Sequence, residues 1–143
     1  MRSIIILSVV FLSVQISCSK KDDLSEKESF LTLKPWKFSK SETRTNNDPW
    51  VDEAVFWPVC EKDNEIVFKK NHSYEINEGA TKCDPLDEQM IDAGRWSLSS
   101  GDTKLVIDGE EVIIEILDAQ QLVFYSVQTL GTDTFTEKFT LVH

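Results

Sequence analysis

Two clusters of acidic residues are the first place to look for chemistry in this 143-residue sequence. Their members are Asp84, Asp87 and Glu88 in the first cluster, and Asp108, Glu110 and Glu111 in the second. A glycosidase needs two carboxyl groups that face each other across a cleft, one of them with a raised pKa. Both clusters stand beside turn residues, where carboxylates are expected to be solvated. The sequence therefore predicts no catalytic pair, and we expect no enzymatic activity.

Other residues that form catalytic or metal sites are few. No serine lies within a Gly-x-Ser-x-Gly elbow, and the chain has no glycine-rich phosphate loop. Two His and 3 Cys leave few ways to build a zinc site. The acidic segment 61–65 lacks the spacing and the central glycine of a calcium-binding EF-hand loop. We predict no catalytic residue, no metal and no cofactor.

The charge of the chain excludes a second class of function. The sequence has 15 Lys+Arg against 25 Asp+Glu, which gives a net charge of -10. Proteins that bind nucleic acid obtain most of their affinity by neutralising phosphates with basic side chains, and this sequence has no basic stripe. Nucleic acid is therefore not an expected partner.

Three aromatic residues lie in a segment that otherwise reads as a loop. Trp50, Phe56 and Trp57 fall between residues 45 and 60, where a connection should be polar. In a loop these side chains either cap one end of the domain by packing on the core, or line a mouth that holds a ligand or partner. They are the candidate ligand-binding residues.

The first residues have the pattern of an export signal. Arg2 is followed by an apolar run over residues 4–12 and by small residues near Ser17, which is typical of a secretory signal peptide over residues 1–17. The run is too short for a transmembrane helix, which needs about 20 apolar residues. A buried strand is the alternative for this segment.

A cysteine follows the predicted signal peptide directly. Residues 14–18, Val-Gln-Ile-Ser-Cys, resemble the lipobox of bacterial lipoproteins, which implies cleavage before Cys18 and its lipidation. The polar residues 18–29 suit a tether. Within it, residues 20–23, Lys-Lys-Asp-Asp, resemble the surface-export signal of Bacteroidota lipoproteins, with a solvated linker as the alternative. We expect a lipid anchor in the outer membrane, on either its periplasmic or its cell-surface face.

The remaining two cysteines are Cys60 and Cys83. Export implies an oxidising compartment, where two thiols in one small domain usually form a disulfide. Such a bridge is worth roughly 3 kcal/mol on the chain-entropy model. Two buried free thiols are the alternative, and neither cysteine is placed as a nucleophile.

The rest of the chain is predicted to be all-β, after one short helix over residues 25–33. Ser25 and Glu28 have the spacing of a helix-capping box. Eight segments then read as strands: residues 36–41, 65–68, 72–76, 95–98, 104–107, 112–117, 122–127 and 135–142. Asp108-Gly109 is the strongest hairpin signal, since a type I′ turn favours that pair. Sequential antiparallel pairing gives an eight-stranded up-and-down barrel, with long connections at 45–60 and 80–93.

Strand alternation also predicts what fills this barrel. It directs one set of aromatic side chains to one face, taken as the interior: Trp36, Phe38, Phe68, Tyr74, Trp96, Phe124 and Phe139. An eight-stranded barrel is just wide enough to be filled by its own side chains or to hold one small ligand. We predict a mostly filled core with, at most, a shallow pocket at the aromatic loop.

Several motifs together resemble one family. They are the lipobox, residues 33–38 (Leu-Lys-Pro-Trp-Lys-Phe), residues 60–64 (Cys-Glu-Lys-Asp-Asn), residues 77–84 (Asn-Glu-Gly-Ala-Thr-Lys-Cys-Asp), residues 95–98 (Arg-Trp-Ser-Leu) and residues 103–105 (Thr-Lys-Leu). Over residues 30–143 the chain resembles the lipocalin-like domains of small Bacteroidota lipoproteins. The resemblance implies a lipocalin-like barrel domain over 30–143 and a place in the cell envelope, without implying an activity.

Two functions remain open at this point. The first is a lipid-anchored module that binds a small apolar ligand. The second is a structural or interaction protein with a filled barrel, whose surface contacts an envelope protein or a glycan. A cavity larger than about 300 Å³ would favour the first function. In both cases we expect a monomer attached to the membrane through its N-terminal lipid.

Overall fold

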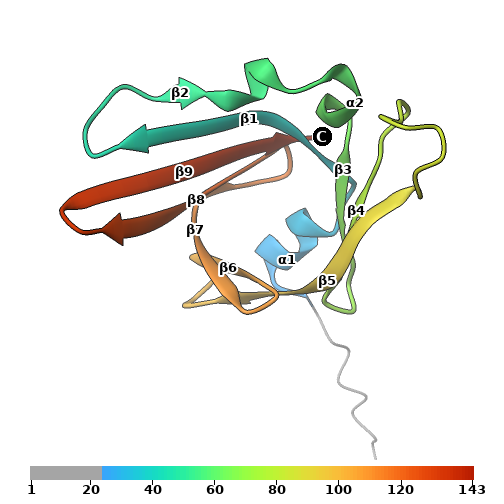
Figure 1. The fold of residues 1–143 in the computed structure, drawn as a ribbon. Helices are drawn as coiled ribbons and strands as arrows, with labels where there is room; N and C mark the ends of the chain where they lie inside the picture. The colour runs from blue at the N-terminus through green and yellow to red at the C-terminus, as the bar shows by residue number, and fades with distance from the viewer. Residues whose placement is uncertain (1–23) are drawn as a thin grey trace, which may run out of the picture.

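The computed structural model describes residues 24–143. These residues form a closed antiparallel barrel of eight strands, to which one short extra strand is added (Figure 1). The predicted all-β, up-and-down barrel is thereby confirmed. The predicted signal peptide, the predicted lipidation site Cys18 and the first part of the tether lie outside the described residues.

The barrel follows the order of the chain: from β3 to β9 each strand pairs with the next, and only β2 lies outside this order, on the edge of β1. The elements are α1 (Glu26–Leu31), β1 (Trp36–Thr45), β2 (Val51–Asp52), the 3-10 helix η1 (Glu53–Phe56), α2 (Val59–Lys62), β3 (Glu65–Phe68), β4 (Ser73–Asn77), β5 (Met90–Ser99), β6 (Lys104–Ile107), β7 (Glu110–Leu117), β8 (Gln121–Leu130) and β9 (Asp133–Val142). Pairing of β1 with β9 along nearly its whole length closes the barrel. The other edge of β1 is shared, because its first two residues pair with β3 and later residues pair with β2.

Both long connections contain more regular structure than predicted. The first, between β1 and β3, holds β2, η1 and α2, and the Asp52 carboxylate caps η1 by accepting from the Ala54 amide at 3.0 Å. The prediction of a connection up to residue 93 was wrong, since β5 begins at Met90. Its early residues pair with β4, where Asn77 lies opposite Met90 and Ile76 opposite Asp92. The partner strand holds this segment extended although its own sequence lacks a clear strand pattern.

Local turn and capping chemistry behaves as the sequence predicts. Asp108 and Gly109 both have positive φ, 50° and 92°, as a type I′ turn requires. In α1 the capping box is complete: the Glu28 amide donates to Ser25 Oγ at 3.1 Å, and the Ser25 amide donates to Glu28 Oε2 at 2.7 Å. The predicted helix is therefore confirmed. None of the helices within residues 24–143 is long and apolar enough to cross a membrane.

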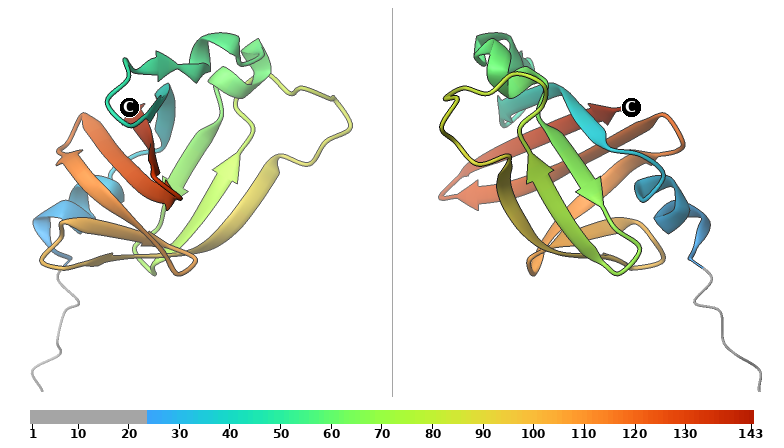
Figure 2. Two further views of the ribbon diagram at one scale, coloured as in Figure 1. Left: turned by 60° about the vertical axis from the view of Figure 1, so that its left-hand side comes forward. Right: turned by 90° about the vertical axis from the view of Figure 1, so that its right-hand side faces the viewer.

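Helix α1 closes one end of the barrel. Leu31, its last residue, has no exposed surface, and the Trp36 indole Nε1 donates to the Leu31 carbonyl at 2.9 Å. The Lys27 ammonium donates to the Asp102 carbonyl in the β5–β6 turn at 2.8 Å. In Figure 2 α1 lies at one end of the barrel, and α2 lies at the opposite end. The helix thus leaves a single end where a ligand could enter.

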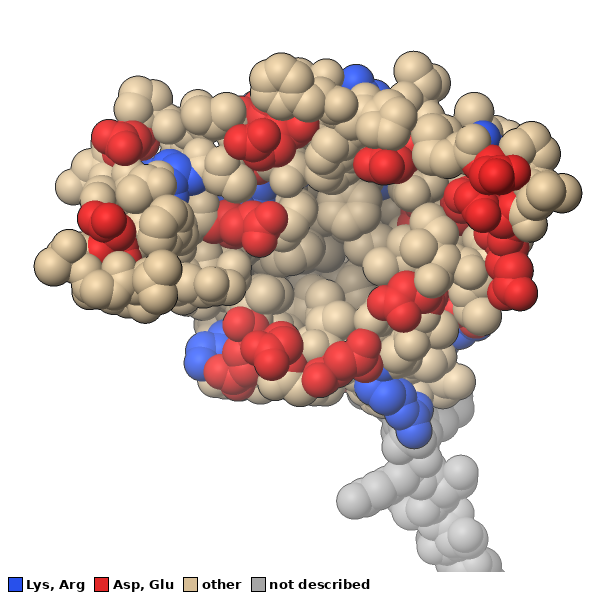
Figure 3. All heavy atoms as spheres, in the orientation of Figure 1, with Lys and Arg blue, Asp and Glu red and all other residues tan. Residues whose placement is uncertain are grey.

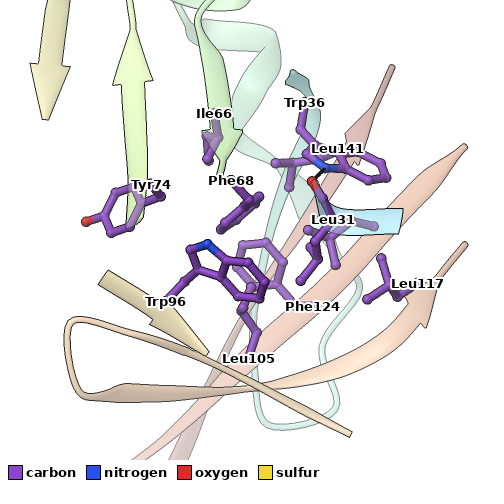
Figure 4. Packing of buried hydrophobic residues seen from close by; sticks show 11 residues of the cluster. Leu31, Trp36, Ile66, Phe68, Tyr74, Trp96, Leu105, Leu117, Phe124 and Leu141 are labelled. Carbon is purple, nitrogen blue, oxygen red and sulfur yellow. Dashed lines mark hydrogen bonds between the residues drawn. The ribbon is translucent and has the colours of Figure 1, made fainter. Parts of the chain in front are cut away.

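The interior is packed with the aromatic side chains that alternation directs inward. Trp36, Phe68, Tyr74, Trp96 and Phe124 are buried (Figure 4), and Phe38 and Phe139 pack against the same cluster. Ring contacts such as Phe68 with Trp96, 5.7 Å between centroids at 78°, fill the space edge to face. The barrel core is therefore formed by its own side chains, and space for a ligand must be sought at the open end.

Candidate functional site

The end of the barrel opposite α1 carries two elements that are joined covalently. Helix α2 and the connection between β4 and β5 lie side by side there (Figure 2). Cys60 of α2 and Cys83 of that connection form a disulfide, with Sγ atoms 1.99 Å apart and Cα atoms 5.1 Å apart. The predicted disulfide is confirmed. It holds together two segments of the barrel rim that are 23 positions apart in the sequence.

A close approach of backbones brings the end of β4 against the turn after α2. A Cβ atom at Gly79 would lie 2.2 Å from the Asp63 carbonyl oxygen, so only glycine fits at this position. The Thr81 amide donates to Asp63 Oδ2 at 2.9 Å, and the Gly79 amide reaches Asn64 Oδ1 at 3.4 Å. These contacts and the disulfide fix the shape of the rim.

A hollow of about 390 Å³ opens at this rim, which we call the mouth hollow. Its lining residues are Phe38, Trp57, Glu61, Asn64, Ile76, Glu78, Cys83 and Ile91. Figure 3 looks at this end of the barrel and shows a depression at its centre, with acidic side chains around it and few basic ones. The volume lies within the range of small-molecule sites, which starts at about 300 Å³.

Glu78 is the unusual member of this lining. Its side chain belongs to a residue that is only 8% exposed, and among residues 24–143 its Oε2 atom has no hydrogen-bond partner. The backbone is held firmly: the Glu78 amide donates to the Gln89 carbonyl at 2.8 Å, and the Gln89 side-chain amide donates back to the Glu78 carbonyl. A buried carboxylate oxygen without a donor is costly, and a bound molecule that supplies a donor would remove that cost.

Of the three aromatic candidates, one lines the mouth hollow. Trp57 packs edge to face on Phe38, with 5.7 Å between ring centroids, and both rings border the hollow. Phe56, its neighbour in the chain, is 77% exposed and is not part of this lining. Trp57 therefore combines the two roles predicted as alternatives, since it packs on the core and lines a mouth.

Trp50 lies elsewhere, over the strands β1 and β9. Its ring is stacked with two cations: the Arg44 guanidinium carbon lies 4.4 Å from its centroid and the Lys138 ammonium 4.3 Å. Lys138 also pairs with Glu42, at 3.6 Å. Trp50 borders a separate hollow of about 440 Å³ with these cations. The three aromatic residues thus do not form one site.

A third hollow, of about 460 Å³, lies along the hairpin of β8 and β9 beside the β1–β2 connection. Its lining mixes hydroxyl and amide side chains, such as Thr43, Ser126 and Gln128, with charged and apolar ones. Arg44, which borders this hollow, also has a buried Nε without a hydrogen-bond partner, but the residue is only half-buried and its guanidinium lies over the Trp50 ring. The mouth hollow is therefore the better candidate, although it is slightly smaller.

In comparisons with known proteins, no protein-family model and no curated protein matches this sequence.

The acidic clusters are solvated, as the sequence predicts. All residues of both clusters are exposed. Asp84 Oδ1 accepts a hydrogen bond from the Leu86 amide at 2.9 Å, and Glu111 Oε2 forms an ion pair with Lys104 Nζ at 2.7 Å. Within residues 24–143 no three His, Cys, Asp or Glu side chains come together in a way that could hold a metal ion.

Asp108 has a structural role instead. Its Oδ2 accepts from the Tyr74 hydroxyl at 2.7 Å, and its Oδ1 accepts from the Arg95 amide at 2.8 Å. Both bonds hold the pKa of Asp108 below its usual value, and the bond from the Arg95 amide has the larger effect. Burial and the neighbouring carboxylates raise the pKa of Tyr74. A Cβ on Gly94 would collide with the Asp108 carboxylate at 2.3 Å, so this glycine lets the β6–β7 turn pack closely against β5.

Glu78 lines the mouth hollow but was not among the predicted ligand-binding residues. A signal was present, because Tyr74, Ile76 and Glu78 are spaced two apart, and alternation directs all three to one face. A charged residue on an inward-facing row is the pattern that could have identified it.

Proposed function

We propose that the protein is a lipid-anchored binding module of the cell envelope, and that the mouth hollow holds a small ligand with an apolar body. One observation carries the ligand: a preformed hollow of about 390 Å³ bordered by Phe38, Trp57, Ile76 and Ile91. Binding sites of this size are concave and mostly apolar, with a few polar groups that fix orientation. Glu61, Asn64 and Glu78 are those polar groups here.

The ligand sits at the barrel end rather than at its centre. The core side chains Trp36, Phe68 and Trp96 are at most 3% exposed, so they leave the middle of the barrel filled. This arrangement supports a ligand of modest size, held against Phe38 and Trp57. It also agrees with the expectation of a pocket at the aromatic loop.

The second candidate is an interaction protein of the outer membrane without a small-molecule ligand. It is favoured by large apolar side chains that are exposed to solvent, which include Phe56, Leu86 and Leu130. Such residues would contact an envelope protein or a glycan. They are scattered over η1, the β4–β5 connection and the β8–β9 turn, which weighs against one contiguous docking patch.

Binding at the mouth hollow is tested by titration with 1-octanol, followed by tryptophan fluorescence. We expect a saturable change with a Kd on the order of 1 mM or tighter, because a ligand with few atoms has a limited binding energy. Ile91→Phe narrows the hollow and should weaken binding about tenfold. Ile113→Phe, the same change at an exposed position on β7, should leave it unchanged. Equal binding by both variants, or no saturation, would count against the proposal.

The anchor is tested separately, by phase partition in a detergent that clouds on warming. Expressed in a bacterium that makes lipoproteins, the wild-type protein should enter the detergent phase because Cys18 carries lipid. Cys18→Ala should stay in the aqueous phase and keep the disulfide. Identical partition of the two proteins would refute lipidation at this residue.

A further inference from the structure

We infer that the mouth hollow selects an organic cation, a ligand with an ammonium group on an apolar body. This inference rests on the proposed function, since it names the chemical class that the same hollow takes. The juxtaposition behind it is a buried carboxylate oxygen without a partner, Glu78 Oε2, in a hollow bordered by Phe38 and Trp57.

The unpartnered oxygen is the first step. Within residues 24–143 no group of the protein donates to Glu78 Oε2, although Glu78 is more than nine-tenths buried. Folding removes most of the water from this carboxylate and supplies nothing in return at that atom. A cationic N–H donor gives the strongest hydrogen bond that a carboxylate can accept. A ligand that brings such a donor would recover the interaction that the fold leaves unmade.

The charges of the lining are the second step. Two carboxylates, Glu61 and Glu78, border the hollow, and no Lys or Arg of residues 24–143 does so. The only basic residue of the β4–β5 connection, Lys82, donates its ammonium to the Asp87 carbonyl instead. An anionic ligand would meet repulsion here, and a neutral one could give Glu78 only a neutral donor, which forms a weaker hydrogen bond than an ammonium group. The net charge of -10 also favours the approach of cations.

The aromatic lining is the third step. Phe38 and Trp57 border the same hollow as Glu78, and the ring of an aromatic residue attracts a cation over its face. Ile76 and Ile91 supply aliphatic surface for the body of the ligand. The hollow therefore offers a carboxylate for an ammonium group and apolar side chains for the chain attached to it.

The fixed position of Glu78 is the fourth step. Backbone contact with Gln89 and the docking of the adjacent Gly79 on Asp63 hold the residue before any ligand arrives. The disulfide between Cys60 and Cys83 closes the rim around it. A preformed site loses little conformational freedom on binding. Little of the interaction energy between Glu78 and an ammonium group is therefore spent on ordering the site.

The experiment compares three probes with one alkyl chain: octylammonium, 1-octanol and octanoate. Calorimetric titration of the disulfide-bonded protein should give an affinity for octylammonium at least tenfold higher than for 1-octanol. Octanoate should bind at least tenfold more weakly than 1-octanol. Glu78→Gln keeps the shape of the side chain and removes its charge, so it should lower octylammonium affinity about tenfold and leave that for 1-octanol within threefold.

Two control variants separate Glu78 from general charge effects. Glu88→Gln removes a charge from the same connection, at an exposed residue outside the hollow, and should change no affinity by more than twofold. Glu61→Gln removes the second carboxylate of the hollow, which is exposed, and should cost less than Glu78→Gln. The ratio between octylammonium and 1-octanol in the wild-type protein decides the question even if Glu78→Gln does not fold.

The outcomes distinguish this inference from the proposed function. Equal affinity for octylammonium and 1-octanol would overturn cation selectivity and leave ligand binding standing. Tighter binding of octanoate would do the same. Failure of all three probes to bind would overturn both the inference and the proposed ligand site.

Discussion

Trp36→Ala is expected to lower the free energy of unfolding by about 4 kcal/mol, in line with other losses of a buried tryptophan. Trp36 has no exposed surface, and it begins β1 while contacting α1 through the Leu31 carbonyl. Its removal leaves a cavity where the helix closes the barrel. Small domains have only about 5–15 kcal/mol of total stability, so the loss should be large in urea unfolding followed by circular dichroism.

Two further variants separate the contribution of the Trp36 hydrogen bond from that of its packing in the core. Trp36→Phe keeps most of the ring and removes the indole donor, so it should cost about 1–3 kcal/mol for a buried carbonyl that loses its partner. Trp50→Ala is the matched control, because Trp50 stacks on Arg44 and Lys138 outside the core cluster. It should cost about 1 kcal/mol. Comparable losses for Trp36→Ala and Trp50→Ala would contradict the described core.

Replacing both Cys60 and Cys83 with serine should lower the free energy of unfolding by about 3 kcal/mol. The two cysteines are 23 positions apart, and the bridge restricts the unfolded chain across that segment. The same variant should bind octylammonium more weakly, because the rim beside Glu78 is no longer held closed. Thermal unfolding and calorimetric titration of one preparation measure both effects.

Wild-type protein treated with a thiol reductant is the control for this double variant. It should unfold at the same temperature as the variant, since both lack the bridge. If the double variant were as stable as the oxidised protein and bound octylammonium equally well, the disulfide would have no part in fixing the rim.

The barrel could be predicted from sequence because its information is local. Period-two alternation marks residues such as Phe68, Tyr74 and Trp96 as inward, and the structure buries them. Asp108 and Gly109 specify their turn through backbone conformations that few other pairs adopt. The disulfide followed from the count of cysteines once export was assumed, and its geometry agrees.

The rim of the barrel could not be predicted in the same way, because its contacts join distant segments. Met90 is extended since it pairs with Asn77, which the residues around Met90 do not reveal. Trp50 and Trp57 are alike in sequence context, yet one stacks on cations of β1 and β9 and the other on Phe38. Burial of Glu78 depends on Gln89 and on the approach of Asp63 to Gly79.

The most direct test of ligand binding at the mouth hollow is a two-dimensional ¹H–¹⁵N NMR titration with octylammonium. The account predicts that the largest shifts fall on the amides of Phe38, Ile76, Glu78 and Ile91 and on the indole N–H of Trp57. The indole N–H of Trp50 and the amides of Arg44 and Lys138 should stay in place. Largest shifts at Trp50, Arg44 and Lys138, or no shifts at saturating probe, would contradict a ligand site at the barrel mouth.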